Sequence, residues 1–164
     1  MITLSCNNNW EEYGMKWSAD IREKIIEDSG KTPDSISVEQ ISDTMQIITT
    51  FKEDTFLRRF RYNPISKDTV ASIYFSGDFK FVLGKKYCSL LKDSYEESIS
   101  YLDILSIGLH KFHYCNGNPK RIGLSFKEPV GTWKEFDSSG NVINIVDYGN
   151  AEQLKELGQI KYYR

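Results

Sequence analysis

The sequence lacks several features by which common classes of protein are recognised. None of its apolar runs approaches the roughly 18 residues that a membrane-spanning helix requires. Its three cysteines, Cys6, Cys88 and Cys115, show no CxxC spacing, which excludes the zinc-ribbon and thioredoxin-like patterns. The Gly-Lys-Lys segment at 84–86 lacks the spacing of a phosphate-binding loop, and no Gly-x-Ser-x-Gly elbow occurs.

Positive charge is also scarce. The 21 Lys and Arg residues are outnumbered by 23 Asp and Glu residues, and the formal net charge is -2. A protein that binds nucleic acid usually carries a basic face, so we expect no nucleic-acid partner. The basic cluster of Arg58, Arg59 and Arg61 is local. In an alternating strand its members point to both faces, where they are expected to be solvated and paired.

Histidine is limited to His110 and His113. On a strand, His113 and Cys115 share one face while His110 points to the other, which splits the ligands of a metal site. We therefore expect no metal and no other cofactor. A nucleophilic pair of either histidine with Cys88 or Cys115 also lacks a clear electropositive site that would lower the pKa of the thiol. We expect no catalytic residues and no enzyme, and a hydrolase with an unrecognised site is an alternative.

The residues that are abundant favour a sheet with one helix. Ten Tyr and nine Phe suit the half-buried surface of a β-sheet, and 164 residues fit one domain. Residues 1–9 read as a polar tether, and a single α+β domain covers residues 10–164. Trp10 to Ser29 is predicted to be a helix that ends at Gly30. Its apolar residues recur at four-residue spacing: Tyr13, Trp17, Ile21 and Ile25.

A meander of antiparallel strands is predicted after a polar linker at residues 31–37. The expected strands are Thr44 to Phe51, Thr55 to Tyr62, Thr69 to Phe75 and Phe79 to Leu83. For Ser94 to Ile107 we expect a short helix that gives way to a strand near Ile107. The predicted fold is an N-terminal helix packed on this meander, which hairpins at residues 107–150 extend.

Two similar segments, residues 112–123 and 131–143, form the C-terminal hairpins. In each, an aromatic strand end meets a turn that contains Gly and Asn, and a second strand follows. Gly117 and Gly140 can adopt the positive φ that tight hairpins need, and the neighbouring Asn residues tolerate it. These segments are expected to form two hairpins that extend the sheet.

The second segment carries a resemblance to a known family. It reads Gly131-Thr132-Trp133-Lys134-Glu135-Phe136-Asp137, then Ser139-Gly140-Asn141-Val142-Ile143. This motif resembles the MORN-type repeat of bacterial YwqK-like proteins. That repeat has a Gly, any residue, a Trp, two further residues and a Tyr or Phe, and then a polar turn with Gly and a strand. The resemblance covers residues 110–150. The first segment lacks the Trp, and the chain has about two units where many members have several.

The YwqK-like family is commonly described as antitoxin or immunity components. The resemblance therefore implies a protein that neutralises a cognate bacterial toxin by direct binding. Aromatic side chains are favoured anchors at interfaces. The residues that we expect to contact this partner are Trp133, Glu135, Phe136, Asp137, Asp147 and Tyr148. The alternative for all of them is packing within the hairpins, which we favour for Trp133.

The N-terminus carries an indication of compartment. Leu4-Ser5-Cys6 and the following Asn run resemble the end of a bacterial lipoprotein signal, in which the Cys becomes lipidated. Only five residues precede Cys6, so the rest of such a signal would lie upstream; the alternative is a frayed polar terminus with an incidental Cys. In an exported chain Cys88 and Cys115 are candidates for a disulfide. In the cytosol they would be buried or free thiols.

We therefore expect a place in the cell envelope or periplasm, with the cytoplasm as the alternative. Contact with a membrane is expected only through a lipid anchor at Cys6. A small envelope lipoprotein with a structural or ligand-binding role is the alternative to the immunity function, and the two are compatible.

Overall fold

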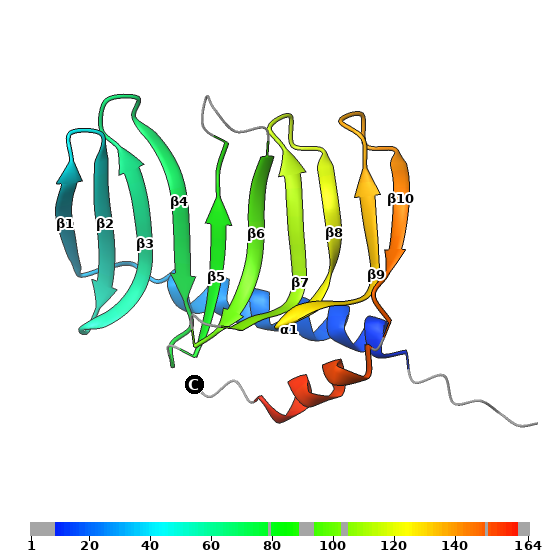
Figure 1. The fold of residues 1–164 in the computed structure, drawn as a ribbon. Coiled ribbons are helices and arrows are strands. Elements are labelled where there is room, and N and C mark those ends of the chain that lie inside the picture. Colours follow the sequence, from blue (N-terminus) through cyan, green and yellow to red (C-terminus); the bar gives the residue numbers. More distant parts are fainter. Residues whose placement is uncertain (1–8, 79, 89–93, 103–104, 150, 161–164) are drawn as a thin grey trace, which may run out of the picture.

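The fold consists of one long helix, a ten-stranded sheet and a short C-terminal helix (Figure 1). The computed structural model describes residues 9–78, 80–88, 94–102, 105–149 and 151–160. Its helices are α1 (Trp10–Ser29) and the 3₁₀-helix η1 (Ala151–Gln159). Its strands are β1 (Ser35–Ser42), β2 (Met45–Lys52), β3 (Thr55–Asn63), β4 (Asp68–Phe75), β5 (Phe81–Lys86), β6 (Ser94–Tyr101), β7 (Leu105–Tyr114), β8 (Pro119–Phe126), β9 (Glu128–Phe136) and β10 (Val142–Asp147).

Helix α1 begins and ends where the sequence predicts. The side chain of Asn9 caps its first turn by accepting a hydrogen bond from the amide of Glu12 at 3.2 Å. At the other end the amide of Gly30 donates to the carbonyl of Ile26 at 2.8 Å. The four-residue spacing gives a buried stripe in which Ile25 is fully buried. Burying a side chain of this size contributes about 1.5–3 kcal/mol.

The strands follow one another in the sheet in the order of the sequence, and every neighbouring pair is antiparallel. This arrangement confirms the predicted α+β meander. The two C-terminal hairpins are also present, and their turn glycines Gly117 and Gly140 have φ values of 87° and 91°. Positive φ is strained for other residues, so glycine suits both turns.

Two predictions about the strands were wrong. The segment 94–107 contains no helix in its described part: it forms β6 and the start of β7. Ile99 of β6 pairs with Leu83 of β5 and Ile107 of β7, and the three side chains form one buried row. A central strand satisfies its backbone on both sides, which outweighs the helical spacing. The linker at 31–37 is shorter than expected, because β1 already begins at Ser35.

Both helices lie on one side of the sheet, where the core is (Figure 1). Helix α1 crosses the strands, and η1 packs against α1. The core joins buried side chains of both helices to those of the central strands: Ile21, Ile25, Phe81, Leu83, Ile99, Ile107, Leu124, Val130, Leu154 and Leu157. No helix in the described part of the chain is long and apolar enough to cross a membrane.

Specific polar contacts fix α1 on the sheet. Gly108 has a φ of 69°, and a Cβ atom there would clash with the hydroxyl of Ser18. This close approach lets the Ser18 hydroxyl accept a hydrogen bond from the amide of Leu109 at 2.7 Å. At the N-terminal end of α1, Glu11 accepts hydrogen bonds from the amide of Thr132 at 2.8 Å and from its hydroxyl at 2.9 Å.

Glu97 of β6 supplies a buried ionic contact to the helix. Its carboxylate lies 2.9 Å from Nε of Arg22 in α1 and 3.1 Å from Nζ of Lys85 in β5. Burial by itself would raise the pKa of Glu97, but the hydrogen bonds from Arg22 and Lys85 outweigh it and lower that pKa below its ordinary value. Because Arg22 belongs to α1, this contact shows that the side chain of Glu97 points to the helix side of the sheet.

Candidate partner-binding face

The face of the sheet opposite α1, which we call the open face, carries one continuous row of side chains. Glu97 points toward α1, so Glu96 points away from it, because neighbouring residues of a strand alternate between faces. Pairing from strand to strand then extends the row of Glu96 across the whole sheet. In strand order the row is Glu39, Ile47, Arg61, Ala71, Lys86, Glu96, Phe112, Arg121, Glu135 and Asn144.

The middle of this row is an ionic cluster around Glu96. One carboxylate oxygen lies 2.8 Å from Nε2 of His110, and the other lies 2.6 Å from Nζ of Lys86. The hydrogen bond from His110 and the neighbouring Lys86 together lower the pKa of Glu96 to about 2, against the opposing effect of burial. Glu96 is therefore ionised at neutral pH, and it joins a side chain of β5 to one of β7.

Trp133 is the centre of an aromatic cluster on β7–β10, but it is buried, with 1% of its surface exposed. Its ring lies over Gly123, where any side chain would collide with it. Its Nε1–H donates to the carbonyl of Leu124 at 2.9 Å. Trp133 was predicted as a partner contact, with hairpin packing as the alternative. The burial of the ring favours packing, and we now assign it the role of supporting the surface.

Arg121 covers the ring of Trp133. Its guanidinium carbon lies 4.6 Å from the centre of the Trp133 ring and 5.6 Å from that of Tyr148. Tyr148 is 43% exposed, so its side chain lies at the surface, and its contact with a partner stays a prediction. Nε of Arg121 also lies 3.5 Å from a carboxylate oxygen of Glu135. The cation is thus held by two rings and one carboxylate, an arrangement that stabilises the cluster.

Glu135 and Phe136, both predicted contacts, border a hollow of 410 Å³ at the end of this cluster. Both side chains are partly exposed. Glu135 accepts a hydrogen bond from the side chain of Asn144 at 3.0 Å. The carbonyl of Phe136 accepts one from the hydroxyl of Tyr114 at 2.9 Å. The structure therefore brings Glu135, Phe136 and Tyr148 to one end of the sheet around the buried Trp133.

The two predicted aspartates serve the turns. Asp137 accepts hydrogen bonds from the side chain of Asn141 at 3.0 Å and from the amides of Asn141 and Ser139 at 2.9 Å. The hydrogen bonds from Asn141 lower the pKa of Asp137. Asp147 accepts a hydrogen bond from the amide of Gly149 at 2.7 Å. Both carboxylates stabilise local backbone, which is the packing alternative considered for them.

A second hollow of 350 Å³ lies on β3–β5 and was missed from the sequence. Arg59, Arg61 and Lys86 contribute its cations. Arg59 donates from Nε to the hydroxyl of Thr49 at 3.4 Å and lies 5.6 Å from the centre of the Phe56 ring. Within the described part of the chain, no acidic side chain forms an ion pair with Arg59 or Arg61.

The expectation that the arginine cluster is paired is therefore wrong for all three arginines within the described part of the chain, because no ion pair there includes Arg58, Arg59 or Arg61. The sequence showed three neighbouring arginines but not what lies across from them. On the open face those positions are occupied by Ala71 and Ile73 of β4, which offer no charge. Arg58, in contrast, points to the helix side of the sheet, so the cluster is divided between the two faces as its alternation predicts.

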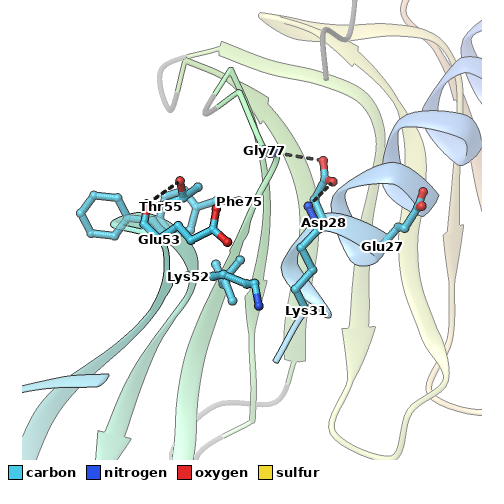
Figure 2. A pocket seen from close by; sticks show the side chains of 10 residues that line it. Glu27, Asp28, Lys31, Lys52, Glu53, Thr55, Phe75 and Gly77 are labelled. Atoms are coloured by element: carbon cyan, nitrogen blue, oxygen red, sulfur yellow. Dashed lines mark hydrogen bonds and ion pairs between the residues drawn. The ribbon is translucent and has the colours of Figure 1, made fainter. Parts of the chain in front are cut away.

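A third cavity, of 520 Å³, lies at the C-terminal end of α1 (Figure 2). Phe56 of β3 and Phe75 of β4 contribute to its apolar part. The carboxylate of Asp28 accepts a hydrogen bond from the amide of Gly77 at 3.0 Å and lies 3.3 Å from Nζ of Lys31 (Figure 2). These contacts attach the turn between β4 and β5 to the helix, so we assign the polar groups of this cavity a structural role.

Neither Cys88 nor Cys115 offers a thiol to His110 or His113. Cys88 and Cys115 are joined by a disulfide, with their Cα atoms 5.6 Å apart. His110 and His113 lie on opposite faces of β7, and burial lowers the pKa of His113. Among the described residues no group of His, Cys, Asp and Glu is arranged to hold a metal ion. The lipidation candidate Cys6 lies outside the described residues.

Comparison of the chain with family models, with curated proteins and with solved structures found no match. The geometry of the open face and the family resemblance of the C-terminal hairpins are therefore the features that indicate a function.

Proposed function

We propose that this chain is an immunity-type protein that neutralises a cognate bacterial toxin by binding it directly through the open face. The observation that carries the proposal is the middle of this row, where five consecutive side chains are charged or aromatic, on a face that neither α1 nor η1 covers (Figure 1): Lys86, Glu96, Phe112, Arg121 and Glu135. The resemblance of residues 110–150 to MORN-type repeats supports the same function. We propose binding without catalysis, because Cys88 and Cys115 are joined in a disulfide and His110 and His113 lie on opposite faces of β7.

The chemistry of the open face suits recognition of a protein. Arginine and aromatic residues are enriched at the centres of interfaces, and Arg61, Phe112 and Arg121 share the row. The side chains are also held in place before any partner arrives: Glu96 fixes His110 and Lys86 by hydrogen bonds. A surface that is already ordered loses less conformational entropy on binding.

The disulfide supports the proposal that the protein acts in the cell envelope. Disulfides persist in oxidising compartments such as the bacterial periplasm and are rare in the cytosol. The bond between Cys88 and Cys115 therefore favours export over the cytoplasmic alternative. It also supports the second candidate function, a small envelope lipoprotein anchored through Cys6 with a structural or ligand-binding role.

The test is co-expression of the chain, with its upstream codons, beside each neighbouring open reading frame. We expect one neighbour to be toxic alone, harmless with this chain, and recovered with it as one complex. Phe112→Asp places a charge in the middle of the open face and should abolish rescue. Lys134→Ala is the matched control, because Lys134 is an exposed residue of the opposite face.

Two outcomes would count against the immunity function. If no neighbour is toxic or binds, the repeat resemblance is only architectural, and the lipoprotein function takes first place. If rescue survives Phe112→Asp but fails in Lys134→Ala, the partner uses the helix side. Metabolic labelling with a fatty-acid analogue, with Cys6→Ser as the control, tests the lipoprotein candidate separately.

A further inference from the structure

The hollow on β3–β5 has an open floor bordered by cations. Two rows of paired residues cross it: Arg61, Ala71 and Lys86 in one, and Arg59, Ile73, Gly84 and Ser98 in the other. A Cβ atom added to Gly84 would meet nothing closer than Ser98 at 3.9 Å, so the floor beside the cations is unfilled. The small residues of β4–β6 thus leave room for a ligand between cationic walls.

The charge of the hollow is positive although the whole chain has a net charge of -2. Arg59, Arg61 and Lys86 line it, and among the described residues of its lining Glu96 is the one acidic residue. That carboxylate is already shared between Lys86 and His110. Lys85 also lines the hollow, but its ammonium group pairs with Glu97 on the helix side at 3.1 Å. The two arginines are therefore the cations left to bind an anion.

The spacing of the arginines limits which anion fits. Arg59 and Arg61 are two residues apart on β3, so their side chains leave the same face about 6.6–6.8 Å apart. An extended polypeptide presents side chains of one face at the same interval. Carboxylates at alternate positions of such a segment would each meet one guanidinium, which binds carboxylates through charge-assisted hydrogen bonds.

We infer that this hollow binds an extended acidic segment of the protein partner, with Asp or Glu at positions i and i+2 held by Arg59 and Arg61. The inference rests on the proposed function and specifies the chemistry of the partner. A phosphate backbone is the competing occupant. We favour the peptide because nucleic-acid binding needs a broad basic surface, whereas these cations are confined to one hollow.

The probe is a fluorescent octapeptide with Glu at alternate positions, compared with a peptide of the same composition whose four Glu residues form two adjacent pairs separated by two residues, so that no two of them lie at i and i+2. Binding to the purified chain is measured by anisotropy at low and high salt. We expect the alternating peptide to bind more tightly, and salt to weaken it. Arg61→Ala should weaken binding about fivefold or more. Gly84→Val should weaken it by filling the floor while keeping every charge.

Lys134→Ala is the control and should bind as the wild type does, since it removes an exposed cation from the other face. Circular dichroism shows that each variant is folded. Absence of binding, equal binding of the two peptides, or equal weakening by Lys134→Ala would overturn the inference. So would a single-stranded oligonucleotide that displaces the peptide and binds more tightly in an Arg61-dependent manner.

The toxin experiment separates this inference from the proposed function. If Arg61→Ala and Gly84→Val leave rescue intact while Phe112→Asp abolishes it, the partner binds the open face without using the hollow, and the inference fails alone. If the alternating peptide binds as expected but no neighbouring protein is neutralised, the acidic ligand stands and the immunity function fails.

Discussion

The two halves of the open face use the same kinds of residue in opposite ways. In the β7–β10 half, Arg121 lies on the ring of Trp133 and beside the carboxylate of Glu135. In the β3–β5 half, Arg59 and Arg61 have no ion-pair partner among the described acidic residues, and they border an open hollow. In one half the arginine has a carboxylate partner within the protein, and in the other half neither arginine has one among the described residues.

This difference separates the residues that stabilise the sheet from those that we propose as contacts of the partner. The sequence directs attention to the aromatic half, where a Trp in a repeat-like segment suggests an anchor. The structure places Trp133 under the surface, so its contacts with Arg121 and Leu124 stabilise the folded sheet. The arginines of the other half look ordinary in the sequence, yet their charges remain available for a partner. Substitutions should therefore separate stability from binding along the row.

The largest effect is expected from Trp133→Ala. Removing a buried ring leaves a cavity and removes the hydrogen bond from Nε1 to the carbonyl of Leu124, and we expect the free energy of unfolding to fall by about 3–5 kcal/mol. Arg61→Ala, at an exposed position, should change it by no more than about 0.5 kcal/mol. Urea denaturation of both variants checks the contrast. Similar losses in the two variants would erase the distinction between the halves.

Next comes the disulfide, which lies between the halves because it joins the segment after β5 to the end of β7. The two cysteines are 27 residues apart in the sequence. Closing a loop of this length stabilises a protein by about 3.5 kcal/mol in the chain-entropy model. Urea denaturation with and without reductant should show that loss. Reductant should not change the free energy of unfolding of the double variant Cys88→Ser, Cys115→Ser. If it does, the loss in the wild type does not come from this disulfide.

A smaller effect is expected at Glu96, where the halves meet. Its pKa is lowered from 4.5 to about 2 in the folded protein, so its contribution is fully present above about pH 4.5 and is lost as the pH falls toward 2. Relative to Glu96→Gln, we expect an advantage of the wild type of about 2 kcal/mol at pH 7. Denaturation of both proteins between pH 7 and pH 2 measures it. A difference that does not change with pH would contradict the assignment to Lys86 and His110.

The smallest effect is expected at Arg121. Arg121→Lys keeps the charge but loses the planar contact with Trp133 and Tyr148, and we expect a loss of about 1 kcal/mol. Arg61→Lys is the matched change in the other half and should leave stability unchanged. Thermal unfolding of the two variants sharpens the comparison. Equal melting temperatures would mean that the stacked arginine adds nothing measurable.

Local signals in the sequence predicted the parts of the fold that depend on short stretches of chain. The four-residue spacing from Tyr13 to Ile25 gave the helix, and Gly117 and Gly140 gave the hairpin turns. The segment around Ile99 was misassigned because its apolar spacing also fits a helix. What makes it a strand is pairing with β5 and β7, which no short window of sequence contains.

The candidate site, like the fold, was predictable from the sequence only where it depends on a short stretch of chain. The sequence indicated the end of the sheet where Glu135 and Tyr148 lie, because both belong to or follow a recognisable hairpin. It could not indicate that Trp133 is covered, since Arg121 reaches it from the neighbouring strand. The hollow beside Arg61 was hidden for the same reason. Its floor is set by small residues on three other strands, and only the register brings them together.

The long helix also has a consequence for how the sheet opens. In a meander each strand contacts chiefly its two neighbours, so stability is passed from one strand to the next. Helix α1 reaches β3 at one end and β9, through Glu11 and Thr132, at the other. We expect amide hydrogens of β1 and β10 to exchange with deuterium first, by fraying, while those of the strands beneath α1 exchange only when the whole domain unfolds.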